Sequence, residues 1–535
     1  MSAVAYGGAS FPSPSGLKHG LTFVGGGYGS IFVFDAPNNT VALRAIKAHE
    51  GPISCLLLVG GALASGGADG FVHLFASSNP AAPSASPGAL ERIHTYKFKQ
   101  VDAGKNVGAL PPPVTSSDPN SLTAFRTKVA KEKAPEPVTA ATTTAPLPTT
   151  GNEGVGGIRA IAILPLGAKR AVATNRHVQI PTLLAGTARC SLWRLEPQAG
   201  FELACGHFAK AMSVAPHPIQ GDAWASCGAD SQLLLWRATE RMPIQRALLS
   251  KPATCVTYSS DGGLVAVGLE DGSLSVVRIN SSKGGGVAKV PAQSTGGSGG
   301  IECLAFAPGS TANGGLLAIG SHDRTIRVLE LVQQSGGALK LTPRCTCSGH
   351  TATVTHLDWS VDGTMIMSNC SAHEVLVWAI PSGKKVLHPM KALANVLWYS
   401  HTCYLGFPVM GIWPEGVDAT HVNSCHVSDG TGGGKGAGLV LTGDDNGGLK
   451  LFNAPCVVEG APYVEGYGHC SGITSARFLK GDRAAVSSGG ADRSVMLWKV
   501  VGKGGAGQRV APVQPDLPGL PRRQCLLQTP WKDFD

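Results

Sequence analysis

Charge, long apolar runs and helix-forming stretches are all scarce in this sequence of 535 residues. Lys, Arg, Asp and Glu together make up only 15% of it, and no run approaches the roughly 18 apolar residues of a membrane-spanning helix. Long runs of Ala, Leu, Glu and Lys, which favour helices, are missing. The N-terminal twenty residues lack the apolar core of a secretion signal. We therefore expect a soluble intracellular protein with no membrane partner.

Glycine, small apolar residues and scattered cysteines are present instead. The 71 glycines favour many short strands joined by tight turns, and the 43% of hydrophobic residues can form a sizeable core. The 14 cysteines lie mostly singly in apolar segments, as buried thiols do in a reducing compartment. A net charge of +9 permits an acidic partner but requires none, and we expect no nucleic acid.

One sequence pattern recurs about nine times along the chain. Where no insertion intervenes, the units end 41 to 52 residues apart. Their closing residues are Phe34, Phe75, Trp193, Trp236, Val277, Leu329, Trp378, Phe452 and Trp498. This period, with three or four alternating apolar strands per unit, predicts an all-β fold of the WD40-type β-propeller class.

Polar residues recur at fixed distances before the closing residue. An Asp lies six positions before it at Asp69, Asp230, Asp271, Asp323 and Asp492. A Ser lies ten positions before it at Ser65, Ser226 and Ser488. A His lies 26 to 29 positions before it at His49, His207, His350 and His469. We interpret them as a buried chain in which the Asp caps a turn and accepts from the His, the His meets the Ser, and the Ser meets the indole of Trp236, Trp378 or Trp498.

The same residue types serve hydrolases, but an active site occurs once whereas this set recurs. We therefore predict no catalytic residue, no cofactor and no small-molecule substrate. The unit that ends at Trp378 has Ala372 at the Asp position, so that either His373 or Glu374 caps the turn or the network has a gap. Near it, Cys345, Cys347 and His350 form a C-x-C-x-x-H cluster that falls short of the four ligands of structural zinc, and we expect no metal.

Several segments resemble the C-terminal propeller of the echinoderm microtubule-associated protein-like family. They include "SGHTATVTHLDWSVDGTMIMSN" and, most characteristic, an insertion with "LGF" and "GIWPEG". The signature residues of that insertion are Trp398, Gly406, Phe407, Trp413 and Asp418. The likeness is strong from about residue 156 to 500 and weaker over 21–76. It implies a tandem propeller of seven and six blades that associates with microtubules and binds tubulin.

Two family features are not found in the chain, namely an N-terminal coiled coil with a basic region and a hydrophobic motif. Nine units are too many for one ring and too few for thirteen blades. The first ring could be incomplete, 77–155 could hide weak blades, or the sequence could be shortened at its N-terminus. We expect a complete C-terminal ring beside a partial N-terminal one. The expected parts are blades in 1–76, a disordered basic Pro-rich insertion in 77–155, further blades of the first propeller in 156–252, the C-terminal propeller in 253–500 and a disordered tail in 501–535.

The insertion carries a cluster of basic residues that could contact acidic tubulin tails. They are Lys97, Lys99, Lys105, Arg126, Lys128, Lys131 and Lys133. The hypothesis is therefore a non-enzymatic scaffold that binds microtubules or tubulin, located in the cytoplasm on the cytoskeleton, with the cilium or axoneme as a further location. The alternative is a general WD40 adaptor in a signalling or ubiquitin-ligase complex, without tubulin contact.

Overall fold

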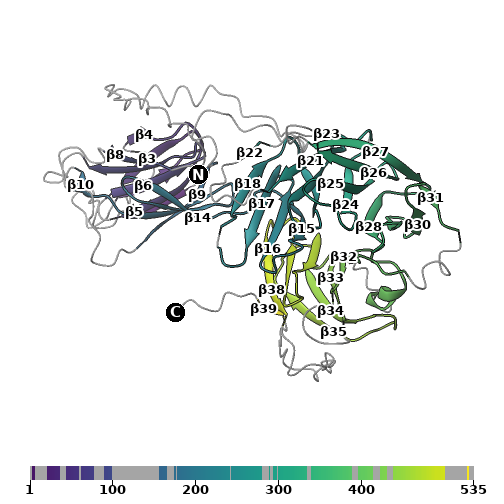
Figure 1. Cartoon of the computed structure of the whole chain (residues 1–535). Helices are drawn as coiled ribbons and strands as arrows, with labels where there is room; N and C mark the ends of the chain where they lie inside the picture. The colour runs from purple at the N-terminus through teal and green to yellow at the C-terminus, as the bar shows by residue number, and fades with distance from the viewer. Residues whose placement is uncertain are drawn as a thin grey trace, which may run out of the picture. The chain divides into compact units, whose positions relative to one another are not determined.

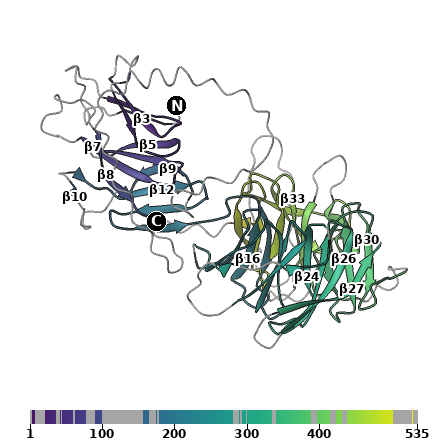
Figure 2. The same ribbon diagram turned by 90° about the horizontal axis from the view of Figure 1, so that it is seen from above.

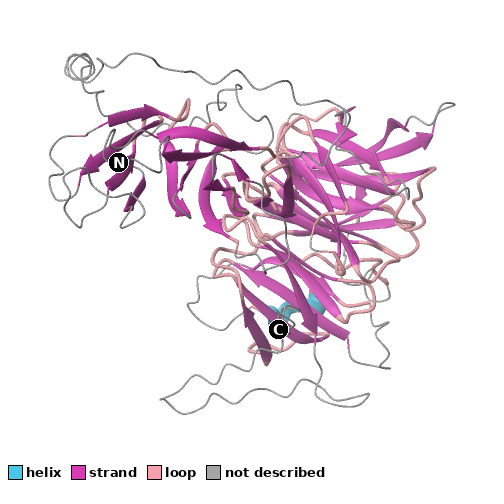
Figure 3. Ribbon diagram, turned by 90° about the vertical axis from the view of Figure 1, so that its left-hand side faces the viewer, coloured by secondary structure: helices cyan, strands magenta, loops and turns pink. Residues whose placement is uncertain are grey.

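The computed structural model divides the chain into two compact units, Met1–Cys205 and Gly206–Asp535. It describes residues 3–6, 21–35, 42, 44–59, 62–77, 90–98, 156–164, 174–175, 178–240, 242–279, 288–289, 293–297, 299–333, 339–387, 396–413, 422–429, 438–500 and 527–528. Strands form almost all the regular structure in these ranges, and one short 3-10 helix accompanies them (Figure 3). None of the described helical structure is long and apolar enough to cross a membrane.

The described residues of the first unit form three four-stranded antiparallel sheets. They are β1 (Ala3–Tyr6), β2 (Leu21–Gly25), β3 (Ser30–Asp35) and β4 (Arg44–Lys47); β5 (Ile53–Val59), β6 (Ala62–Gly67), β7 (Val72–Ser77) and β8 (Leu90–Tyr96); and β9 (Ile158–Ile163), β12 (Leu183–Thr187), β13 (Leu192–Leu195) and β14 (Gly200–Ala204). A separate hairpin joins β10 (Thr174–Asn175) to β11 (Val178–Gln179). Strand β5 contacts both β1 and β9, so the three sheets pack side by side as consecutive blades.

The described residues of the second unit form six sheets. In chain order they are β15 (Ala211–Pro216), β16 (Ala223–Gly228), β17 (Gln232–Arg237) and β18 (Gln245–Leu248), with β22 (Ala288–Lys289) added at the edge; β19 (Ala253–Tyr258), β20 (Leu264–Leu269), β21 (Ser273–Arg278) and β23 (Gln293–Ser294); β24 (Ile301–Phe306), β25 (Gly314–Ser321), β26 (Thr325–Gln333) and β27 (Leu339–Ser348); β28 (Val354–Trp359), β29 (Met365–Cys370), β30 (Val375–Ala379) and β31 (Lys384–Lys385); β32 (Val422–Val427), β33 (Gly438–Asp444), β34 (Gly448–Ala454) and β35 (Tyr463–Tyr467); and β36 (Ser475–Phe478), β37 (Ala484–Ser488), β38 (Val495–Val500) and β39 (Leu527–Gln528). The helix η2 (Phe407–Ile412) lies between the fourth and fifth sheets in the sequence.

The second unit is a closed ring of six blades (Figures 1 and 2). Its first strand, β15, contacts β19 of the next blade and also β36 and β37 of the last blade. Ala211 and Gly490 form a β-bridge at this closure, and the Thr474 hydroxyl donates to the Ala211 carbonyl at 2.8 Å. In Figure 1 the yellow strand β38 accordingly lies beside the teal strand β16. The predicted all-β propeller fold is confirmed.

The strands follow from the placement of their apolar residues. β12 alternates between buried and partly buried positions, as an amphipathic strand does. The second strands of the blades are different, since every residue of β6, β16 and β20 is buried. Neighbouring blades cover both faces of these strands, which explains why their sequences are rich in Ala, Ser, Val and Gly and lack charge.

Three of the predicted boundaries need correction. The sequence predicts that residues 156–252 belong to the first propeller. The sheet β15–β18 instead packs between sheets of the second unit, so the second ring begins near Gly206 and not at residue 253. Residues 156–252 therefore give the first unit one described blade. The segment 77–155 contains the strand β8, and in 501–535 the strand β39 pairs with Lys499 and Val500. Residues 78–89 and 99–155 lie outside the described residues.

Candidate functional site

The His, Asp, Ser and Trp of one blade form a continuous buried chain. His207 Nδ1 lies 3.0 and 3.1 Å from the two Asp230 oxygens, and its Nε2 lies 2.8 Å from Ser226 Oγ. The indole N–H of Trp236 donates to the same hydroxyl at 2.8 Å. Asp230 also accepts from the backbone N–H groups of Phe208 and Gln232, so the carboxylate ties the start of the blade to the hairpin turn.

His49, Ser65 and Asp69 form the same arrangement in the first unit. His49 Nδ1 lies 2.9 and 3.0 Å from the Asp69 oxygens, and Nε2 lies 2.7 Å from Ser65 Oγ. Burial alone would raise the pKa of the Asp69 carboxyl, but the bonds from His49 and from backbone N–H groups lower it below its usual value. The carboxylate is therefore held in its ionised form.

A glycine between the Ser and the Asp makes room for each pair. A Cβ atom on Gly67 would lie 2.4 Å from His49 Nδ1, and one on Gly228 would lie 2.7 Å from His207 Nδ1. Any side chain there would push the His and the acid apart. The recurring Ser-x-Gly spacing is thus a steric requirement of the network.

In the last blade, the predicted serine is wrong by one residue. His469 Nδ1 lies 2.8 Å from Asp492 Oδ2, but Nε2 lies 2.7 Å from Ser487 Oγ, which also accepts from the Trp498 indole at 2.7 Å. Ser488 instead pairs with Thr474 Oγ1 at 2.9 Å. The hairpin turn of this blade is one residue longer than in the others, so counting back ten positions from Trp498 reaches the opposite face of the strand.

In the blade that contains His350, Glu374 takes the place of the missing Asp. His350 Nδ1 lies 3.2 Å from Glu374 Oε2, which also accepts from the Thr351 N–H at 3.0 Å. His350 Nε2 lies 2.7 Å from Ser368 Oγ, and Trp378 donates to that hydroxyl at 2.8 Å. His373 is the left-handed turn residue, with φ of 61°. The sequence left His373, Glu374 or a gap in the network as alternatives, and the structure shows that Glu374 takes the place of the Asp.

The remaining two predicted aspartates cap turns without a histidine. Asp271 accepts from the N–H of Ser273 at 3.0 Å, and Asp323 accepts from the N–H of Thr325 at 3.1 Å. Asp323 also forms an ion pair with Arg327. In these blades the carboxylate organises only its own hairpin.

The four His-centred networks are separate from one another. Each lies in a different blade, and none of the four histidines lines the central cavity of the second unit, whose volume is about 1060 Å³. Burial lowers the pKa of His350 and of His469 and favours their neutral form. We infer that these residues hold the blades in shape.

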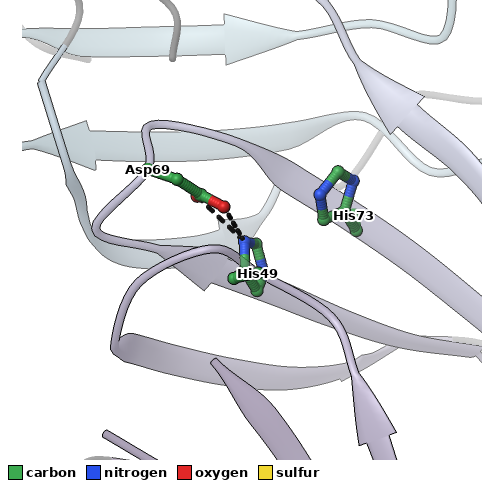
Figure 4. Close-up of side chains that lie close together, drawn as sticks. All are labelled: His49, Asp69 and His73. Carbon is green, nitrogen blue, oxygen red and sulfur yellow. Dashed lines mark hydrogen bonds and ion pairs between the residues drawn. The ribbon is translucent and has the colours of Figure 1, made fainter. Parts of the chain in front are cut away.

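Figure 4 shows an additional histidine beside the network of the first unit. The ring of His73 lies 4.7 Å from that of His49, and its Nδ1 is 2.8 Å from Thr95 Oγ1. Burial lowers the pKa of His73 to about 3, and repulsion by His49 adds to this effect. His49, Asp69 and His73 each place a ligand-type atom within 4.8 Å of the others, as do His350, Cys370 and Glu374. The sequence pattern gave no sign of either trio.

The signature insertion is held in the ring by buried acceptors on the fourth blade. Asp358 is fully buried and accepts from the N–H groups of Thr402 and Cys403 at 2.7 Å each and from the Ser400 hydroxyl at 2.7 Å. Asn369 accepts from the Leu405 N–H at 3.0 Å. Neither acceptor stood out in the sequence, because an Asp or Asn inside a strand has no fixed spacing to its partners.

The other side of the insertion packs on the fifth blade. Tyr404, Val409 and Ile412 share an apolar core with Val422 and Cys425. The segment therefore fills the space between the fourth and fifth blades as a wedge. Trp398 forms a β-bridge with Ser360, while Trp413 contacts the rings of Tyr404 and His373.

Two signature residues shape the exposed end of the wedge. Gly406 has φ of 141° and ψ of 161°, a conformation that is essentially restricted to glycine. It places Phe407 at the start of η2 with 65% of its surface exposed. Asp418 lies outside the described residues.

The wedge and the inner strands of the ring together line the central cavity. Four histidines on its wall, His217, His356, His401 and His426, have their pKa lowered by burial, to about 3 for His356 and His426. Arg477, also on the wall, donates to Ser424 Oγ at 2.8 Å. Of the basic residues predicted to contact tubulin, Lys97 is exposed, and the other six lie outside the described residues.

Comparison with known proteins identifies relatives of the chain. Residues 212–500 match the family model described as the echinoderm microtubule-associated protein second beta-propeller. Human echinoderm microtubule-associated protein-like 3 is 34% identical over 350 residues, which are 65% of this chain and 36% of that protein. Echinoderm microtubule-associated protein-like 2 of the rat is 33% identical over 336 residues, which are 62% of this chain and 48% of that protein.

Echinoderm microtubule-associated protein-like 4 of Xenopus laevis is 31% identical over 338 residues, which are 63% of this chain and 34% of that protein. The chain thus spans between about a third and a half of the length of these relatives. The match to the second propeller covers more than half of the chain and coincides with the closed ring of six blades. The chain belongs to the echinoderm microtubule-associated protein-like family.

Proposed function

We propose that this protein is a non-enzymatic scaffold of the cytoskeleton that binds microtubules or tubulin. The observation that carries the proposal is the match of residues 212–500 to the second propeller of a family whose members are named as microtubule-associated. The structure adds a physical argument, because a closed ring with buried networks is a rigid support for exposed binding residues.

The wedge offers such residues. Phe407 and Met410 of η2 are 65% and 57% exposed, and Val458 is 68% exposed. The backbone of η2 is joined to the loop that carries Val458, since the Gly411 N–H donates to the Cys456 carbonyl at 2.8 Å. We call Phe407, Met410 and Val458 the apolar patch. Large exposed apolar side chains on a rigid support favour protein binding.

Electrostatic attraction would supplement this contact. The chain has a net charge of +9, and the basic cluster from Lys97 to Lys133 lies in a segment rich in Pro and Ala. Attraction between such a segment and acidic tubulin tails weakens as salt screens the charges. We propose the cytoskeleton as the location on the same grounds, with the cilium or axoneme as a further site.

Co-sedimentation of the full chain with stabilised microtubules tests the proposal. We expect binding at low salt that weakens at high salt, and a loss of about tenfold in affinity for the double variant Phe407→Ser, Met410→Ser. The matched control is Ile219→Ser, because Ile219 is also 65% exposed but lies on the first blade of the ring.

A chain that neither co-sediments with microtubules nor captures soluble tubulin at low salt would refute the proposal. The alternative of a general WD40 adaptor would then stand. Binding that survives in the double variant but disappears when the basic cluster is neutralised would assign the contact to the basic segment alone.

A further inference from the structure

The fourth blade of the second ring departs from the repeat at two positions. Cys370 stands two residues after the network serine, where three other blades have Gly67, Gly228 and Gly489. The acid follows the left-handed turn residue in this blade, as Glu374, whereas in the others it precedes that residue. Both changes bring a new side chain to the same point beside His350.

From these changes we propose that His350, Cys370 and Glu374 form a binding site for a zinc ion. This inference goes beyond the proposed function and does not depend on it. Imidazole nitrogen, thiolate sulfur and carboxylate oxygen are the ligand types that zinc takes in proteins. Three protein ligands leave a fourth position for water.

The distances fit a tetrahedral ion after a small expansion. Glu374 Oε2 lies 3.2 Å from His350 Nδ1 and 3.2 Å from Cys370 Sγ, and all three ligand atoms are within 4.8 Å of one another. Tetrahedral zinc with ordinary bond lengths separates N from O by about 3.3 Å and S from O by about 3.5 Å. The N–O and S–O distances therefore need to widen by only about 0.1 and 0.3 Å to reach these values.

The hydrogen-bonding network of this blade also permits the histidine tautomer that a metal needs. Ser368 Oγ lies 3.3 Å from the Leu376 carbonyl, which can accept the hydroxyl proton. The Nε2–H of His350 can then donate to Ser368, and the lone pair on Nδ1 faces Cys370 and Glu374. Such a fixed partner on the second ring nitrogen is typical of zinc-bound histidines.

A zinc ion can reach this site, and the proton that its binding displaces can be accounted for. The Glu374 side chain is 30% exposed while that of His350 is fully buried, so the ion can enter from the carboxylate side. In the metal-free state the Cys370 thiol donates to Glu374. Zinc would take the place of this proton, which leaves to solvent as the thiolate binds the ion.

Two other candidates are weaker. His49 and Asp69 make the same bidentate contact as His207 and Asp230, so the repeat explains them without a metal. The C-x-C-x-x-H cluster does not assemble, because Cys347 is packed in the apolar core of the third and fourth blades, and the structure groups His350 with Cys370 instead.

Titration of the metal-free full chain with Co²⁺ and Zn²⁺ tests the site. We expect one equivalent of Co²⁺ to produce a sulfur-to-cobalt charge-transfer band that Zn²⁺ abolishes. X-ray absorption of the zinc form should show one sulfur at about 2.3 Å and lighter ligands at about 2.0 Å. Zinc should also raise the melting temperature, since it binds only the folded site.

The variant Cys370→Gly restores the residue of the other blades and should lose the band and at least about tenfold in zinc affinity. Glu374→Gln should weaken zinc binding while the far-ultraviolet circular dichroism stays unchanged. Cys347→Ser and His73→Leu are the matched controls and should keep the band. A band that persists in Cys370→Gly, that disappears in Cys347→Ser, or that never forms at one equivalent would overturn the proposal.

Discussion

The network of the last blade makes a sharp prediction, because two adjacent serines have opposite roles. Ser487 Oγ serves both the His469 imidazole and the Trp498 indole, each at 2.7 Å. Ser488 Oγ contacts Thr474 Oγ1 at 2.9 Å. Spacing along the sequence favours Ser488 as the network residue, whereas the structure assigns that role to Ser487. Replacing each by alanine distinguishes the two.

The magnitudes follow from the groups left without a partner. Ser487→Ala orphans a buried imidazole nitrogen and a buried indole N–H, and each unsatisfied group costs about 1–3 kcal/mol. With partial relaxation we expect a loss of about 2–4 kcal/mol. Thr474 in Ser488→Ala keeps the Ala211 carbonyl at 2.8 Å as its acceptor. That variant should therefore lose only about 0.5–1 kcal/mol.

Urea unfolding of the full chain, followed by tryptophan fluorescence, measures the difference. Ser226→Ala is the matched control, because Ser226 holds the same place between His207 and Trp236 and should behave like Ser487→Ala. Hydrogen exchange in β37 and β38 would localise the effect. The reasoning fails if Ser488→Ala is the more destabilising change, or if Ser487→Ala unfolds within about 0.5 kcal/mol of the wild type.

Three further predictions concern the wedge and the cavity wall. Asp358→Asn turns an acceptor of several hydrogen bonds into a partial donor and should lower the unfolding free energy by about 2–4 kcal/mol in the same urea assay; no change would contradict the anchoring role. Gly406→Ala should cost about 1–3 kcal/mol through backbone strain, while Gly206→Ala, at an ordinary φ and with open space around the added Cβ, serves as its control in thermal melting. Unfolded histidine takes up a proton below pH 6.5 but folded His356 does so only near pH 3, so acid favours unfolding. His356 should thus contribute a loss of about 1.4 kcal/mol per pH unit below 6.5, and melting curves of His356→Phe should show a smaller slope.

The repeat allowed most of the fold to be predicted, because each blade carries its own closing residue and turn residues. Closing aromatics and turn acids lie a few residues from one another, so their spacing predicts the hairpin that joins them. All nine predicted units correspond to nine sheets in the described part of the chain. The boundary between the rings escaped prediction for a physical reason. The sequence of the strands around Ser226 would be the same whether this blade started the second ring or ended the first. The contact of Ala211 with Gly490, which are far apart in the sequence, shows that the blade belongs to the second ring.

The same distinction between local and distant signals applies to the candidate site. Asp69, Asp230 and Asp492 could be found because the turn places them at a nearly constant distance from the closing residue. One extra turn residue was enough to move the prediction from Ser487 to Ser488, since side chains alternate between the faces of a strand. Asp358 could not be found, because its partners lie more than forty residues further along the chain.

The fourth blade of the second ring departs from the repeat in a different way from the other blades. The fourth blade carries Asp358, which holds the wedge, and Cys370 and Glu374, which replace the common glycine and acid. Its turn residue His373 contacts Trp413 of the wedge. In the second and third blades the acid has lost its histidine partner and caps only its own turn. The fourth blade keeps its His, Ser and Trp bonded to one another and adds a thiol beside the acid, and the proposed zinc site gives this addition a chemical reason.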